Sequence, residues 1–433
     1  MLADATLPVP ASLMTLLAGL APLFTAPSFR TFCGLACGFL AQTGKRTVCG
    51  MLAGASLSQL WPHDRAHRFF SRARWSADDL GLAAARLVAA LLVPAVAIDG
   101  TVFKRRGKKA RAASWFHDGS AAGPDKTGYG SNRVIAAVVV RLPILSRPVA
   151  IPVLAKLVIK GTSSASRLWL APHGRGHRRR AARAGHPRGR RRRLRREGTD
   201  GTPGRHHLDH PAAQGRRAVR SPASPDRPAG RPRTRGDKLP SPARLAATAA
   251  FVPVTVTRYG KTATVHAAAV TCLWYGVFGS RPVQVVPIRD TPATGYDLAL
   301  VTTDPGAGLT QVIERYAARW SIEVAIGDAR QVFGAGQARN RTARAVERTV
   351  PFPLACQAIA TTWYATAGHH PADAEDHRAR APRHTTKAQP STAGMAAKLR
   401  RVLIAARFRP PQPDQPTLEE INVIRLAREE LAA

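Results

Sequence analysis

VPAVAIDG, residues 93–100, separates a helical beginning from a strand-rich continuation. Five small or branched apolar residues surround Pro94, and Asp99 and Gly100 follow them directly. A short apolar run between a proline and a glycine is typical of a buried strand. We therefore predict a strand that ends at Asp99-Gly100 and carries a carboxylate at its tip. Taken alone, such an acid fits a turn as well as it fits a metal site.

The residues before this stretch are predicted to be helical. Ser76, followed by Asp78 and Asp79, forms an expected N-cap with an acidic first turn, and the apolar run Leu80–Leu92 comes next. Residues 1–24 are apolar but contain three prolines and no Lys or Arg, so we expect neither a signal peptide nor a membrane span. Two interpretations of the first ninety residues stay open: a DNA-binding helical domain, or a bundle with a solvated basic surface.

The charge of the chain points to a polyanionic partner. Its 65 Lys and Arg residues outnumber 27 Asp and Glu, which gives a formal net charge of +38. Cationic side chains that neutralise phosphates release condensed counterions, so such an excess favours binding of nucleic acid. Lys104 and Arg105 open a basic, glycine-containing loop after the first strand, and we take both as candidate DNA-binding residues.

Strand-like runs continue beyond that loop, which is expected to extend from Lys104 to Tyr129. Residues 133–142 and 149–159 are rich in Val, Ile and Ala, and they predict an antiparallel meander with the first strand. From Phe251 to Thr303 more β-branched runs alternate with turn residues. Helical periodicity returns at 309–333 and 342–367. We expect a flexible polar linker at 368–394 and a last helix at 395–408.

Residues 173–237 differ sharply from the rest of the chain. They contain 20 Arg, no Lys and five acids, and their only large aliphatic residues are Leu194, Leu208 and Val219. Such a segment cannot form a hydrophobic core, and we expect it to be disordered in isolation.

A second chemical pattern lies in YAARWSIE, residues 316–323, with Arg330 seven residues later. Tyr316, Arg319, Glu323 and Arg330 are separated by three, four and seven residues, so on one helix they share a face. A carboxylate for a divalent metal, two guanidiniums for phosphates and a ring for base stacking suit phosphodiester chemistry. An ordinary amphipathic helix with an internal Glu–Arg pair explains the spacing equally well.

The spacing Tyr-x2-Arg-x3-Glu-x6-Lys/Arg resembles the signature of insertion-sequence transposases of the DDE superfamily. Here Tyr316, Arg319, Glu323 and Arg330 match it, with Arg in place of the usual Lys, and Asp99 matches the family's first acid. The resemblance implies an RNase H-like α/β fold with a mixed sheet, a β-rich insertion and a helical N-terminal domain. It also implies that Asp99 and Glu323 are catalytic residues that bind Mg²⁺ or Mn²⁺, together with a second acid.

That second acid is not evident in the sequence. Its expected strand falls inside residues 173–237, where Glu197, Asp200 and Asp209 lack an apolar run before them. Out-of-frame reading of GC-rich codons for Val, Asp and Ala gives Arg, Pro, Gly and His, so we interpret the segment as a frameshift product. The competing interpretation is a basic arm that binds DNA.

The sequence thus predicts a DNA transposase, impaired by loss of the second catalytic acid, that cleaves and joins DNA strands. The alternatives are a non-catalytic nucleic-acid-binding remnant and a nuclease on the same scaffold. The expected partner is double-stranded DNA, both as transposon ends and as target. We expect a homodimer on DNA and no membrane partner. The expected location is the cytoplasm, at the nucleoid. The predicted domains are a helical DNA-binding domain (1–90), the first part of the catalytic domain (91–172), the arginine-rich segment (173–237), a β-rich insertion and strand (238–305), the helical end of the catalytic domain (306–368), and a linker with C-terminal helices (369–433).

Overall fold

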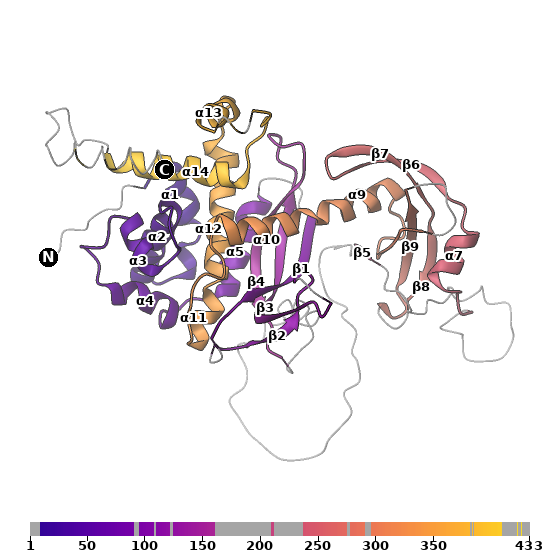
Figure 1. Cartoon of the computed structure of the whole chain (residues 1–433), viewed down its shortest axis with the longest axis horizontal. Coiled ribbons are helices and arrows are strands. Elements are labelled where there is room, and N and C mark those ends of the chain that lie inside the picture. The colour runs from indigo at the N-terminus through magenta and orange to yellow at the C-terminus, as the bar shows by residue number, and fades with distance from the viewer. Residues whose placement is uncertain are drawn as a thin grey trace, which may run out of the picture. The chain divides into compact units, whose positions relative to one another are not determined.

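The computed structural model describes most of the chain outside the arginine-rich segment (Figure 1). The described residues are 9–90, 95–107, 110–121, 124–160, 209–211, 237–274, 278–290, 296–381, 383 and 385–408, with 422 and 426. They belong to two compact units: unit 1 comprises Met1–Leu168 and Ser321–Ala433, and unit 2 comprises Trp169–Trp320. None of the described helices combines the length and apolar character needed to span a membrane.

Unit 1 begins with the predicted helices, which are α1 (Ala11–Ala18), η1 (Ala21–Leu23), α2 (Ala26–Ala41), α3 (Val48–Gly54), α4 (His63–Ser71) and α5 (Ala77–Ala89). The predicted cap is confirmed, because the Ser76 hydroxyl accepts a hydrogen bond from the Asp79 amide (3.1 Å). Aromatic side chains hold this part together: Phe24, Phe32, Phe69 and Trp75 lie in ring contact with one another.

Sheet A, also in unit 1, contains β1 (Ala95–Lys104), β2 (Ala113–His117), β3 (Thr127–Val140) and β4 (Val149–Leu157). β3 pairs antiparallel with β1 on one side and with β2 and β4 on the other. The predicted meander is confirmed, but the loop expected from Lys104 to Tyr129 was wrong, since it contains β2. Trp115 on β2 packs edge-on against Tyr129 on β3 (5.6 Å between centroids), and this cross-strand pair favours a strand there.

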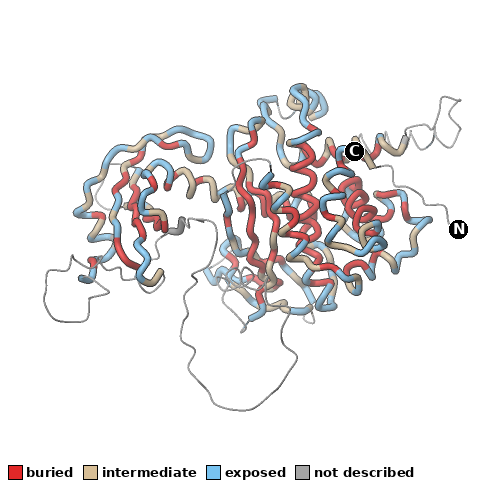
Figure 2. The backbone as a smooth tube through the Cα atoms, turned by 180° about the vertical axis from the view of Figure 1, so that it is seen from behind, coloured by how far each residue is buried: buried red, intermediate tan, exposed pale blue. Residues whose placement is uncertain are grey.

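The C-terminal part of unit 1 is helical: α10 (Ser321–Gln331), α11 (Ala343–Arg348), α12 (Pro351–Trp363), the π-helical turn η3 (Tyr364–Gly368), α13 (Asp373–Arg380), α14 (Thr392–Ala405) and η4 (Ala406–Phe408). All residues of α12 are buried, and Figure 2 shows burial concentrated in sheet A and the helices beside it. The prediction of a flexible linker at 368–394 was wrong in part, because α13 lies within this range. Acids in the first turn of α13 and Arg and His in its last turn complement the helix dipole.

Unit 2 contains β5 (Asp209–Pro211), α7 (Pro242–Thr248), β6 (Val252–Arg258), β7 (Lys261–Ala267), β8 (Val270–Leu273), β9 (Pro282–Arg289), β10 (Leu298–Thr302) and α9 (Leu309–Arg319). Its strands form sheet B in the order β5-β10-β9-β7-β6, with β8 also paired to β9. Apolar residues of α9, including Val312 and Ile313, pack on this sheet. The β-branched runs predicted between residues 251 and 303 are therefore strands.

The α/β fold class is confirmed. Every strand pairing described is antiparallel. The strand that is expected to end in the second acid falls within residues 173–237, and this segment lies outside the described residues except for 209–211 and 237.

Candidate active site

Asp99 lies in the middle of β1, where it stands opposite Ile135 of β3. The prediction that the strand ends at Asp99-Gly100 was wrong, because β3 is long enough to pair with all ten residues of β1. Side chains alternate along a strand, so Ala97, Asp99 and Thr101 share one face of sheet A. Asp99 is half-buried on that face, and its carboxylate accepts a hydrogen bond from the Gly100 amide (2.8 Å).

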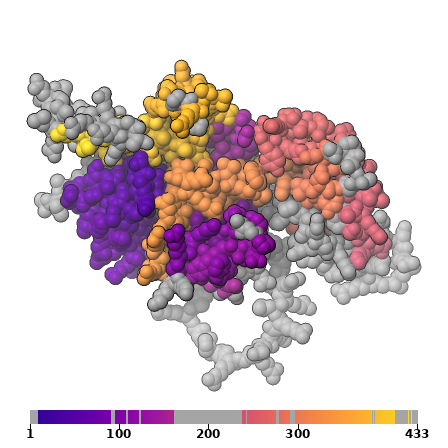
Figure 3. Space-filling view, in the orientation of Figure 1, coloured from indigo at the N-terminus to yellow at the C-terminus, as the bar shows by residue number. Residues whose placement is uncertain are grey.

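Helix α10, which carries the predicted acid Glu323 in its first turn, packs against β1, β3 and β4. Arg330, near its end, donates from Nη2 to the Thr101 hydroxyl and to the Val102 carbonyl oxygen (2.9 Å). Glu323 precedes Arg330 by seven residues, which is about two turns or roughly 10 Å along the same helix face. In the space-filling view (Figure 3) the surface of α10 borders that of the β1–β2 region. Asp99 and Glu323 thus belong to two elements in direct contact.

Arg330 is anchored by the protein itself. Its guanidinium lies over the Phe103 ring, 5.2 Å from the centroid, in addition to its two hydrogen bonds with β1. Burial lowers the pKa of Arg330, and the negative charge of Asp118 acts in the opposite direction. Both hydrogen bonds use Nη2. The residue therefore fixes α10 on β1 whatever else it binds.

Asp118 is an acid of this neighbourhood that sequence reasoning missed. It follows β2, is 8 % exposed, and accepts hydrogen bonds from the Ser120 hydroxyl (2.6 Å) and amide (3.1 Å). The hydroxyl contact is the main cause that lowers the pKa of Asp118, and the charges of Lys104 and Arg330 lower it further. The sequence signal was present, since Asp-x-Ser is a typical Asx-turn pattern, but the hairpin that brings it to Arg330 was not predicted.

The two predicted basic residues after Asp99 are placed differently. Lys104, the last residue of β1, is exposed. Arg105 turns inward: its Nη1 donates to the carbonyl oxygen of Ala338, and its backbone amide donates to Tyr129 (3.1 Å). Positive φ angles at Gly334 (59°) and Gly336 (91°) allow the chain after α10 to reverse and reach Arg105.

Tyr316 and Arg319 belong to α9 and therefore to unit 2, whereas Glu323 and Arg330 belong to unit 1. The prediction that all four share one helix face thus crosses the boundary between units and stays a prediction. Tyr316 packs on the sheet B core, and the Arg319 guanidinium lies 5.5 Å from the centroid of its ring. Beside them Tyr259 and Trp320, which are 52 % and 50 % exposed, form an edge-to-face pair (6.3 Å) that sequence reasoning missed.

The described acids do not complete a metal centre. No group of three or more His, Cys, Asp or Glu side chains within the described ranges could hold a metal ion. Of the substitutes considered for the second acid, Asp209 lies on β5 in unit 2, where it pairs with Thr302, while Glu197 and Asp200 lie outside the described residues. Two carboxylates are fewer than a two-metal phosphoryl-transfer site requires, so the fit to a divalent metal is incomplete.

One comparison with known proteins finds a family over part of the chain. Residues 19–201 match the sequence profile of a family described as DDE superfamily endonuclease, and the match includes Asp99 and ends before Glu323. No curated protein matches the chain significantly. Over residues 19–201, the chain is therefore similar to the DDE superfamily of endonucleases.

Proposed function

We propose that this chain descends from a DNA transposase of an insertion sequence and that the loss of its second catalytic acid impairs its chemistry. Asp99 and Glu323 are the proposed ligands of Mg²⁺ or Mn²⁺, the ion that supplies charge stabilisation in phosphoryl transfer on DNA. Tyr316, Arg319, Arg330, Lys104 and Arg105 are the proposed DNA contacts. Double-stranded DNA, both transposon end and target, is the proposed partner, with a homodimer assembled on it at the nucleoid.

One observation carries the proposal: the family match contains Asp99, and the helix packed on the strand of Asp99 carries Glu323. The Glu–Arg spacing of the signature also has a structural explanation that supports it. Arg330 anchors α10 to β1, and Glu323 lies about two turns earlier in the same helix. An ordinary surface helix with a Glu–Arg pair does not require this anchor.

The proposed impairment is supported by the exposed side of β1. Within the described ranges β1 pairs with β3 alone. Val96 and Ile98, which share the face opposite Asp99, are 60 % and 42 % exposed. Apolar side chains in a catalytic sheet are normally covered, and an open edge strand is a liability that proteins avoid. We propose that the missing strand with the second acid belongs beside β1.

The second candidate function is a nucleic-acid-binding remnant without chemistry, and the incomplete set of acids among the described residues favours it over a fully active enzyme. Its binding depends on the basic surface, whose contacts with phosphates need no metal. A nuclease on the same scaffold differs from a transposase only in failing to join strands.

The experiment separates binding from cleavage. The purified chain is titrated with a labelled duplex that carries the transposon end, and nicking is followed with Mg²⁺, with Mn²⁺ and with EDTA. Binding without nicking, identical in the wild type, Asp99→Ala and Glu323→Ala, supports a remnant that retains binding but no chemistry. Metal-dependent nicking that Asp99→Ala abolishes shows that catalysis survives, and strand joining then distinguishes a transposase from a nuclease. Absence of duplex binding at low salt contradicts both candidates.

A further inference from the structure

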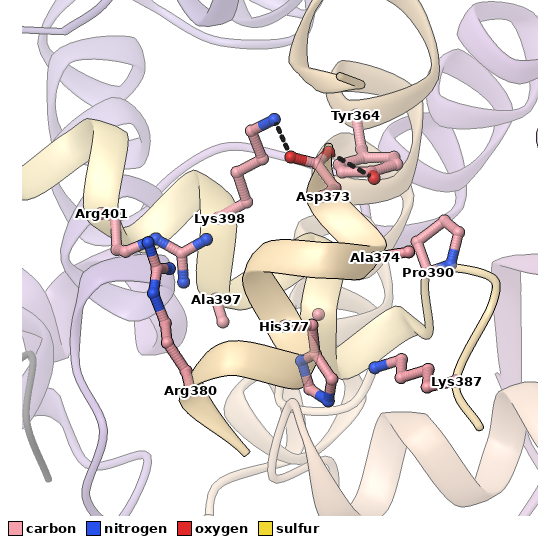
Figure 4. Close-up of a pocket in the computed structure, with 11 residues that line it drawn as sticks. Tyr364, Asp373, Ala374, His377, Arg380, Lys387, Pro390, Ala397, Lys398 and Arg401 are labelled. Carbon is pink, nitrogen blue, oxygen red and sulfur yellow. Dashed lines mark hydrogen bonds and ion pairs between the residues drawn. The ribbon is translucent and has the colours of Figure 1, made fainter. Parts of the chain in front are cut away.

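A small pocket in unit 1 lies among α13, α14 and the π-helical turn η3 (Figure 4). Its volume is about 50 Å³, room for roughly three or four water molecules or one phosphate group. It has no residue in common with the Asp99–Glu323 site. π-helical turns are rare and occur frequently at functional sites, and here the turn supplies Tyr364 to the pocket wall.

The charges around this pocket do not balance. Its lining contains Arg380, Lys387, Lys398 and Arg401, but the single acid there is Asp373. That carboxylate is already engaged: it accepts hydrogen bonds from the Tyr364 hydroxyl (2.6 Å) and from Lys398. Lys398 and Asp373 therefore neutralise each other, and three positive charges remain. Asp373 and Asp376 both act on Arg401 electrostatically, and Asp376 does not line the pocket.

Two of the remaining cations face each other. Figure 4 shows the guanidiniums of Arg380 and Arg401 side by side at one end of the pocket. Burial lowers the pKa of Arg401, and the like charge of Arg380 lowers it further. Neither guanidinium makes a hydrogen bond or an ion pair with a described residue. Two guanidiniums that lie close together repel each other. Their closeness becomes favourable when an anion lies between them, because both can donate hydrogen bonds to its oxygens.

The opposite wall is held in place by its own contacts. Arg378 donates to the Lys387 carbonyl oxygen (2.8 Å), and the Lys387 ammonium donates to the Ser391 hydroxyl (3.1 Å). Ser391 is in turn the N-cap of α14 and accepts from the Gly394 amide (3.2 Å). The third cation is thus fixed at the edge of the pocket before any ligand enters.

We propose that this pocket binds a phosphate group through Arg380, Arg401 and Lys387. The phosphate is either free inorganic phosphate or one phosphodiester of bound DNA, and the two sources share the chemistry that the pocket recognises. In the second case the pocket extends the DNA contacts of the proposed function to the C-terminal helices. In the first it holds a structural anion that does not depend on DNA.

The test uses the full chain and the double variant Arg380→Gln/Arg401→Gln, with Arg86→Gln, an exposed arginine outside the pocket, as the matched control. Inorganic phosphate is titrated at constant ionic strength, and the thermal midpoint and ³¹P line width are recorded. The proposal expects phosphate to raise the midpoint and broaden the line for the wild type and for Arg86→Gln, and both effects to vanish in the double variant. Removing the repulsion should leave the phosphate-free midpoint of the double variant unchanged or higher.

Duplex DNA distinguishes the sources. A pocket that takes one DNA phosphate contributes about 0.9 to the slope of log K against log salt, so the double variant loses about one unit of slope while Arg86→Gln matches the wild type. An unchanged slope together with the phosphate effect assigns the pocket to the free anion. If phosphate has no effect on the wild type and the slope is also unchanged, the proposal is overturned. Should the double variant fail to fold, the wild-type ³¹P titration and the single variant Arg401→Gln decide. Absence of broadening in the wild type overturns the inorganic phosphate site, and a salt slope of Arg401→Gln equal to that of the wild type overturns the DNA contact.

Discussion

Replacing Arg348 should destabilise unit 1 more than any surface arginine does. Arg348, at the end of α11, is 4 % exposed. It donates to the carbonyl oxygens of Phe69 (3.2 Å), Phe70 (3.1 Å), Ala73 (2.8 Å) and Trp75, and its guanidinium lies 4.2 Å from the centroid of the Trp75 ring. One side chain therefore caps the carboxyl end of α4 and fixes it to the C-terminal helices.

The magnitude follows from these contacts. Four hydrogen bonds at about 1 kcal/mol each give about 4 kcal/mol. The cation–π contact adds about 1 kcal/mol. Burial of the charge, which lowers the pKa of Arg348 to about 10, is unfavourable and is relieved by the substitution. We therefore expect Arg348→Ala to cost about 3 kcal/mol net, with Arg348→Lys intermediate because its ammonium has three donors and no planar fork.

Hydrogen exchange of the amides of α4 and α11 measures this cost within unit 1, whatever unit 2 does. The matched control is Arg344→Ala in the same helix, since Arg344 is exposed and makes one hydrogen bond, to the Arg72 carbonyl oxygen (3.1 Å). We expect the control to lose about 0.5 kcal/mol or less. Equal losses in Arg348→Ala and Arg344→Ala, or a loss below about 1 kcal/mol in the former, would refute the capping role.

Two further outcomes are expected. A Cβ at Gly38 would lie 1.8 Å from the Met51 carbonyl oxygen, so Gly38→Ala should lower the thermal midpoint strongly. A Cβ at Gly327 in α10 would meet nothing within 4 Å, so Gly327→Ala should stabilise the protein by up to about 1 kcal/mol. A lower thermal midpoint for Gly327→Ala than for Gly38→Ala contradicts the helix packing. Because the pKa of Asp118 is lowered by Ser120, its contribution is full above the ordinary carboxyl pKa and is lost as the pH falls below it. Asp118→Asn should therefore flatten the acid limb of stability below about pH 4, measured by denaturation at each pH.

Local patterns were sufficient for much of the fold. The Ser76 cap, the strands β3 and β4 and the strands of unit 2 follow from signals within a few residues. The extent of β1 does not follow from such local signals. Gly100 marks a turn in isolation, yet it lies opposite Val134, and pairing with β3 continues the strand to Lys104. Tertiary pairing outweighs the local preference of glycine here.

The uses of arginine were the least predictable part of the site. A net charge of +38 suggests phosphate contacts, but Arg133, Arg330 and Arg348 bind backbone carbonyls within unit 1. Arg133 is fully buried, and burial lowers its pKa to about 9. Sequence spacing identifies such residues without showing which way they point. Asp118 was missed for the same reason, because the cations that act on it, Lys104 and Arg330, come from β1 and α10.

The central claim is that Asp99 and Glu323 are the two remaining ligands of a damaged catalytic centre. It is tested most directly by restoring the reading frame across codons near 170 to 235 and measuring Mg²⁺-dependent nicking of a transposon-end duplex. The account predicts that the chain as it stands does not nick, that the restored chain does, and that Asp99→Asn or Glu323→Gln abolishes the restored activity while duplex binding persists. A restored frame that contains stop codons or no strand ending in Asp, or nicking that survives both substitutions, would contradict it.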